Sequence, residues 1–221
     1  MAPPSSTPSD VDRGRRRGTA AWAVAVLLFV GACGDDPAPA GDVGTTDVGG
    51  DAVGDAAADT EDDAAPDVAD DTVKKGLTEI RLADPSFDLQ SFVEGARSAF
   101  AMIIDAYAKG DRQTLEPLLA EDVYRSFASV IDEREAEGQT MQFELVSIRK
   151  AELFAAHLVD GHVARVTVRF VSEQINLLKD QDGTIVDGDP AQIDELTDLW
   201  TFERDTRSSD PNWGLVETRA P

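Results

Sequence analysis

The stretch DELTDLWTFERDTRSSDPNWGLVET, residues 194–218, decides the fold of this chain. It holds two of the three tryptophans, Trp200 and Trp213, each in a run where apolar and polar residues alternate. Such alternation is typical of a β-strand with one buried face. Asp-Pro-Asn at 210–212 favours a turn between the runs. We expect a closing hairpin whose aromatic side chains cover an apolar core, because a bare two-stranded hairpin is marginal in water.

Amphipathic helices are expected before this hairpin. The first is capped by Ser86 or Asp88 and runs to about Lys109, because its apolar residues recur at spacings of three and four. Gly110 suits the position after its end, and a short second helix follows. A third helix should cover about 121–136, with its apolar residues turned inward.

Beyond Gly138 the apolar period changes to two, which indicates strands around residues 143–155 and 164–170. Asp160 and Gly161 form a strong hairpin-turn signal between them. Helices followed by antiparallel strands imply an α+β domain over 85–221, which is long enough for a core of its own.

Several stretches of this domain resemble the family named for subunit forty-four of the mitochondrial translocase of the inner membrane. They are D-x-W-T-F-E-R and D-P-N-W-x-L-x-x-T near the end, and upstream FVEGARSAFAMIIDAYAKGDRQTLEPLLAEDVY, REAEG and DQDGTIVDGDP. The resemblance implies the cystatin-like fold shared with nuclear transport factor two, in which helices pack on a curved antiparallel sheet around an apolar pocket. It also implies an adaptor that works in membrane protein transport, with lipid or a translocation complex as partner.

We expect the pocket to lie between the long helix and the sheet. A curved sheet under a single helix should leave a wedge of space that takes an acyl chain or an apolar peptide side chain. The candidate lining residues are Phe100, Ile103, Ile104, Tyr107, Phe143, Val168, Trp200 and Phe202.

The N-terminal segment, residues 1–33, has the pattern of a bacterial lipoprotein signal. Four arginines between Arg13 and Arg17 precede an apolar run at 20–30, which is shorter than the ~20 residues that span a bilayer. The run ends in Val-Gly-Ala-Cys, which resembles a lipobox and makes Cys33 the expected site of acylation. The expected location is the cell envelope, with the domain on the periplasmic side of a membrane. The alternatives are an uncleaved signal anchor and a twin-arginine signal.

Residues 34–84 are rich in Asp, Ala and Gly and contain 15 acidic and 3 basic residues. Such a segment buries too little apolar surface to offset the ordering of its backbone. We therefore expect a disordered acidic linker that separates the domain from the membrane.

Charge and composition exclude several functions. A net charge of −23 repels phosphate backbones, so no nucleic-acid partner is expected. One cysteine and two histidines leave no set of zinc ligands, and no cofactor or metal is expected. No catalytic residue is assigned, and the chain is expected not to be an enzyme. Two alternatives stay open: an envelope enzyme with Asp122 as base, and a scaffold that forms a homodimer through its exposed sheet face.

Overall fold

The computed structural model describes residues 71–221. The expected signal segment with Cys33, and linker residues 34–70, lie outside the described residues. In chain order the helices and strands are α2 (Asp71–Ala83), α3 (Leu89–Lys109), α4 (Arg112–Leu115), α5 (Glu121–Ala136), β1 (Thr140–Val159), β2 (Val163–Lys179), β3 (Ile185–Asp187), β4 (Asp194–Asp205) and β5 (Gly214–Arg219).

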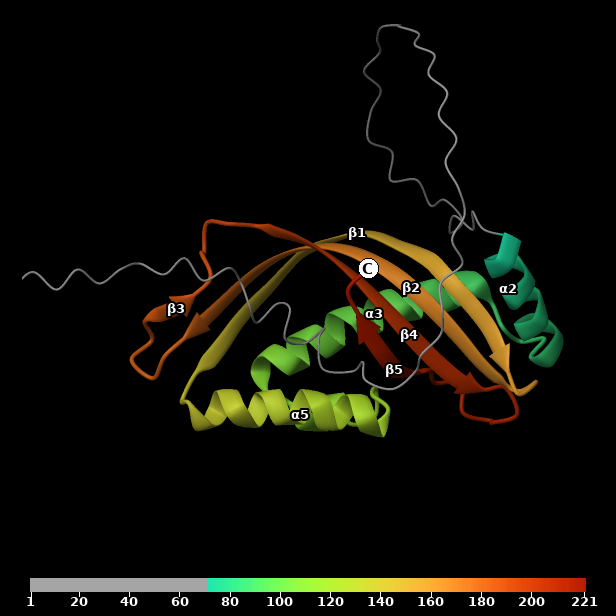
Figure 1. Cartoon of the computed structure of the whole chain (residues 1–221), viewed down its shortest axis with the longest axis horizontal. Helices are drawn as coiled ribbons and strands as arrows, with labels where there is room; N and C mark the ends of the chain where they lie inside the picture. The colour runs from blue at the N-terminus through green and yellow to red at the C-terminus, as the bar shows by residue number, and fades with distance from the viewer. Residues whose placement is uncertain (1–70) are drawn as a thin grey trace, which may run out of the picture.

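The strands form one antiparallel sheet in the order β1-β2-β4-β5, with β3 paired to the end of β2. Figure 1 shows this sheet as an arch, with α3 and α5 beneath it and α2 at one end. The predicted α+β class, with helices preceding an antiparallel sheet, is confirmed. The face of the sheet that α3 covers is called the inner face below.

The long helix α3 begins and ends where its capping residues predict. The Asp88 side chain accepts a hydrogen bond from the Ser91 backbone N–H, 2.8 Å away. Gly110 has a left-handed φ of 70° and donates to the carbonyls of Ala106 and Tyr107. That φ favours glycine, which explains why α3 stops here.

The curvature of the sheet has a local cause in β1. Its pairing with β2 shifts register at three places, between Leu145 and Ser147, between Ile148 and Lys150, and at Leu153. Such irregularities bend a strand and increase its twist. The β1–β2 turn falls at Asp160 and Gly161 as predicted, with φ values of 50° and 72°.

The linker predicted over 34–84 is wrong at its C-terminal end. Residues 71–83 form α2, which buries Val73, Leu77 and Ile80 against the domain. These residues are four and three apart, so they lie on one helical face. Gly76 brings the helix close to β1, because an added Cβ would lie 1.8 Å from the Ala156 carbonyl oxygen. The folded domain therefore includes residues 71–84, which had been assigned to the linker.

The core lies between α3 and the inner face. Phe100 is fully buried and its ring stacks on Phe170, with centroids 4.5 Å apart, while Trp200 lies 4.7 Å away. These three rings fill the space over the centre of the sheet. The predicted closing hairpin thus covers an apolar core, as its alternating pattern requires.

Candidate functional site

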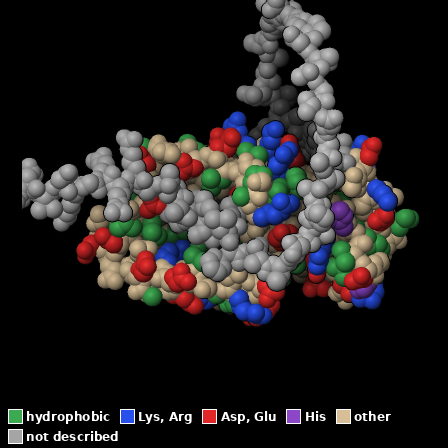
Figure 2. Space-filling view, viewed as in Figure 1, with side chains coloured by type: hydrophobic (Ala, Val, Ile, Leu, Met, Phe, Trp, Pro, Cys, Tyr) green, Lys and Arg blue, Asp and Glu red, His purple; other side chains and the backbone are tan. Residues whose placement is uncertain are grey.

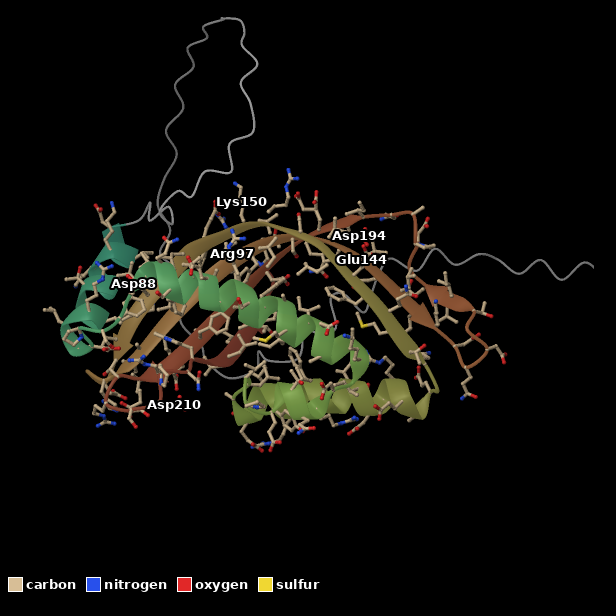
Figure 3. The ribbon with its side chains drawn as sticks, turned by 180° about the vertical axis from the view of Figure 1, so that it is seen from behind. Asp88, Arg97, Glu144, Lys150, Asp194 and Asp210 are labelled. Atoms are coloured by element: carbon tan, nitrogen blue, oxygen red, sulfur yellow. The ribbon has the colours of Figure 1, made fainter. Side chains whose placement is uncertain are left out.

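A groove of about 390 Å³ runs beside the N-terminal half of α3. One wall is α3, the other is the segment that enters β5, and the floor is the end of β4. Figure 3 marks Asp88 at the start of α3 and Asp210 in the segment between β4 and β5. The lining residues are Ser86, Phe87, Asp88, Ser91, Phe92, Gly95, Ala96, Ala99, Met102, Leu118, Phe202, Arg204, Pro211, Asn212 and Trp213.

Small residues on α3 keep this wall open. Ser91, Gly95 and Ala99 follow one another at intervals of four, so they form a single stripe along the helix. A Cβ added at Gly95 would meet no atom within 4 Å. Met102 continues the stripe and is 47% exposed. The helix backbone is therefore accessible to a molecule lying in the groove.

Aromatic rings form the opposite wall and its junction with the helix. The Trp213 ring lies 4.8 Å from Phe92 and 5.8 Å from Phe87, centroid to centroid. Phe92 in turn meets Phe202 edge-on at 6.1 Å. The packed rings give this wall an apolar surface with fixed geometry.

An ion pair closes one end of the groove. The Arg204 guanidinium donates to the Asp84 carboxylate and lies 5.7 Å from the centre of the Trp213 ring. The Ser86 hydroxyl and backbone N–H also donate to Asp84, and these bonds lead the causes that hold its pKa below the ordinary value. Asp84 therefore stays ionised, and the pair joins the segment between α2 and α3 to β4 at this end.

The predicted pocket residues do not lie together around this groove. Only Phe202 of the eight lines it. Phe100, Ile103, Val168 and Trp200 are buried in the core. The wedge expected under α3 is occupied over the sheet centre, because Phe100 reaches across to Phe170 and Trp200.

The remaining three candidates also lie away from the groove. Tyr107 is buried against Phe127, 5.2 Å away, and burial raises the pKa of its phenol. Ile104 and Phe143 are partly buried. The pocket role of all eight stays a prediction.

Sequence reasoning missed most of the groove. Phe92 read as an ordinary residue of an apolar helical face, and Trp213 as part of a strand. The spacing of Ser91, Gly95 and Ala99 was a usable signal, because three small residues in one stripe leave a helix surface open.

Asp122, the candidate general base, is exposed to solvent and does not line the groove. Asp122 lies in the first turn of α5, where its side chain is 85% exposed and pairs with Arg125. Among residues 71–221 no three His, Cys, Asp or Glu side chains gather in a way that would hold a metal ion. No helix in this described part is long and apolar enough to cross a membrane.

The fold and the groove together define an α+β domain in which helices pack on a curved antiparallel sheet and an aromatic groove opens beside α3. The model of the Tim44-like domain family matches residues 73–220 of this sequence. The chain belongs to this family.

The relatives include mitochondrial and bacterial proteins. The probable mitochondrial import inner membrane translocase subunit tin-44 of Caenorhabditis elegans is 26% identical over 149 residues, which cover 66% of this chain and 35% of that protein. The TIM44 subunit of Saccharomyces cerevisiae is 30% identical over 151 residues, which cover 63% of this chain and 34% of that protein. An uncharacterized protein of Rickettsia prowazekii is 25% identical over 143 residues, which cover 65% of this chain and 58% of that protein.

The match to the mitochondrial proteins is confined to one part of them, because the chain spans about a third of their length. Among solved structures, the intermembrane space region of the chloroplast protein ARC6 aligns with a TM-score of 0.43 at 14% identity, covering 58% of this chain and 95% of that one.

Proposed function

We propose that this chain is a non-enzymatic adaptor, tethered to a membrane of the cell envelope through acylated Cys33, that binds an extended apolar segment of a partner protein in the groove beside α3. The single observation that carries the proposal is the groove itself, with its aromatic wall and its open helical wall. Membership of the Tim44-like family supports a role in membrane protein transport.

The dimensions of the groove favour an extended segment over a helix. The stripe from Ser91 to Met102 covers three helical turns, or roughly 16 Å. A helix of that length and ~10 Å diameter needs far more space than the groove provides. One extended strand of polypeptide with one or two apolar side chains matches the volume of the groove better.

Polar groups on both walls favour polypeptide over an acyl chain. Ser91 on α3 and Asn212 on the opposite wall offer a hydroxyl and an amide to the groove. These groups can pair with the N–H and C=O of a peptide backbone, whereas a hydrocarbon chain has nothing to pair with them. Affinity would come from burial of apolar side chains, at about 25 cal/mol per Å².

The test is binding of the full chain to labelled decapeptides that carry two Leu or Phe residues in a Ser/Thr background, measured by fluorescence anisotropy. We expect binding that changes little with salt. Gly95→Leu should abolish it by filling the groove, while Ser98→Leu, on exposed helix surface outside the groove, should leave it unchanged. Equal affinity in wild type and Gly95→Leu would overturn the proposal. If lauric acid displaced every peptide and no peptide sequence were preferred, an acyl chain rather than a polypeptide would be the favoured ligand of the groove.

A further inference from the structure

The inner face of the sheet divides into an apolar half and a polar half. Along β2, the inward residues from Val166 to Phe170 are apolar and fully buried. Beyond Phe170 the inward residues become polar yet stay buried, with at most 6% exposure, and they are Ser172, Gln174 and Asn176. Gln174 donates to the Ser172 hydroxyl at 2.7 Å and accepts from Asn176 at 3.4 Å. Buried polar groups in such a row require an explanation.

A carboxylate on the neighbouring strand has no partner. Asp198 pairs in register with Phe170 and lies on the same side of β4 as Trp200, so it points to the inner face. Its residue exposure is 7%, and its side chain makes no hydrogen bond or ion pair with any residue of 71–221. Burial alone raises the pKa of this carboxyl to about 6.

A hydroxyl on β5 is unpartnered in the same region. Thr218 pairs in register with Trp200, so it also faces inward and lies diagonally across from Asp198. Its Oγ1 is buried and has no hydrogen-bond partner within the described part of the chain. Diagonal neighbours on adjacent strands have Cβ atoms within roughly 8 Å of each other. The two unpartnered groups therefore lie on neighbouring strands of the same face.

The sheet edge beside these residues is uncovered among residues 71–221. Pairing of β5 with β4 ends at Arg219 and Leu199, so the part of β4 from Asp194 to Asp198 has a partner strand on the β2 side only. Ala220 and Pro221 beyond β5 are exposed. A ligand can approach Asp198 from this edge without crossing the core. Figure 3 marks Asp194 at the start of this part of β4.

We propose that Asp198 and Thr218 form a binding site for the protonated primary amine of a small ligand, at the open edge of β4. The ammonium would donate to the Asp198 carboxylate and to Thr218 Oγ1, which supplies partners to two side chains that have none. Ser172 and Gln174 would meet polar atoms of the ligand body. This site is separate from the groove and does not depend on the adaptor role.

The acidic character of the protein suits such a ligand. The chain carries a net charge of −23, and Figure 2 shows acidic side chains along α5. A negative field draws cations to the surface, but it does so everywhere and without specificity. The experiment must therefore separate a defined site from general attraction.

The test is calorimetric titration of the full chain with n-butylammonium, with n-butanol as the uncharged analogue. We expect saturable binding of one n-butylammonium and none of n-butanol. Asp198→Asn should weaken binding by at least about tenfold, since a hydrogen bond to a charged group is lost. Thr218→Val, which keeps the side-chain shape, should weaken it several-fold.

Asp194→Asn is the matched control, because it removes the same charge from the same strand at a carboxylate already bonded to Gln192. It should bind n-butylammonium as the wild type does. Affinity should also decline as pH falls through about 6, where the Asp198 carboxylate takes up a proton. Absence of saturable binding would overturn the proposal, and so would an equal loss in Asp194→Asn or a flat pH profile in that range.

Discussion

The Asp84 carboxylate, directly after α2, accepts a hydrogen bond from the Arg204 guanidinium on β4, 120 residues away in the sequence. Their side chains are only 9% and 13% exposed, so water screens this pair little. The contact ties α2 to the strand that forms the floor of the groove. Arg204 also packs over Trp213, so one ion pair holds the helix, the floor and the aromatic wall together.

Removal of Asp84 should therefore be costly. We predict that Asp84→Ala lowers the free energy of unfolding by about 3 kcal/mol, because it leaves the Arg204 charge buried without its partner. Asp71→Ala is the control, since its pair with Lys74 is exposed to solvent and such pairs contribute little to stability. Urea unfolding measures both. Equal, small losses in the two variants would show that the Asp84–Arg204 pair does not hold α2.

Two glycines should respond in opposite directions to the same substitution. Gly→Ala in a helix interior ordinarily stabilises by about 1 kcal/mol. Gly95→Ala should follow that rule, because its added Cβ meets open space. Gly76→Ala should destabilise by more than about 2 kcal/mol, because its Cβ would lie 1.8 Å from the Ala156 carbonyl oxygen and push α2 off β1. The melting temperatures of the two variants, measured by thermal unfolding, test this prediction. Stabilisation in both variants would contradict the observed packing of α2 on β1.

Asp198 should make the domain more stable as the solution is acidified. Its folded-state pKa of about 6 lies above the ordinary 3.8, so the folded protein binds this proton more tightly than the unfolded chain. Stability from this group therefore rises as pH falls from about 7 to about 4. Asp198→Asn should flatten that rise and add roughly 2 kcal/mol at pH 7, where a buried charge is removed. A pH series of urea unfolding curves tests this, and a variant less stable than the wild type at pH 7 would refute it.

The proposed anchoring through Cys33 can be tested directly, although this residue lies outside the described residues. We predict that Cys33→Ser yields an uncleaved precursor and abolishes labelling with radioactive palmitate. The check is the mass of the protein recovered from the membrane fraction. A variant processed to the wild-type mass would mean that the protein is not a lipoprotein.

Local signals explain why much of the fold was predictable. Asp88 marks the start of α3 by its capping hydrogen bond, and Gly110 marks its end by its positive φ. Asp160 and Gly161 adopt the positive φ values that their turn needs. The helix α2 was missed because it directly follows a long stretch rich in Asp, Ala and Gly, and the short stripe of Val73, Leu77 and Ile80 gives little periodic signal. Their burial depends on contact with β1, which local composition does not report.

The groove and the amine site depend on contacts between distant segments. Phe92 and Trp213 are separated by more than a hundred residues, and their meeting follows from the path of β4 and β5. The sequence did not indicate that Phe100 stacks on Phe170 and fills the space over the sheet centre, because nothing local reports that contact. Asp198 was read as part of a family motif, and its lack of a partner became visible only through the register of β4.

The most direct test of the adaptor role is site-specific photocrosslinking in cells that express the full chain. A benzoylphenylalanine at Ala99, on the groove wall, should give one discrete adduct with a protein. The adduct should disappear when Gly95→Leu is added and persist when Ser98→Leu is added, and the same probe at Ser98 should give none. Adducts of equal yield from Ala99 and Ser98, or an Ala99 adduct that survives Gly95→Leu, would contradict the claim that the groove holds a partner.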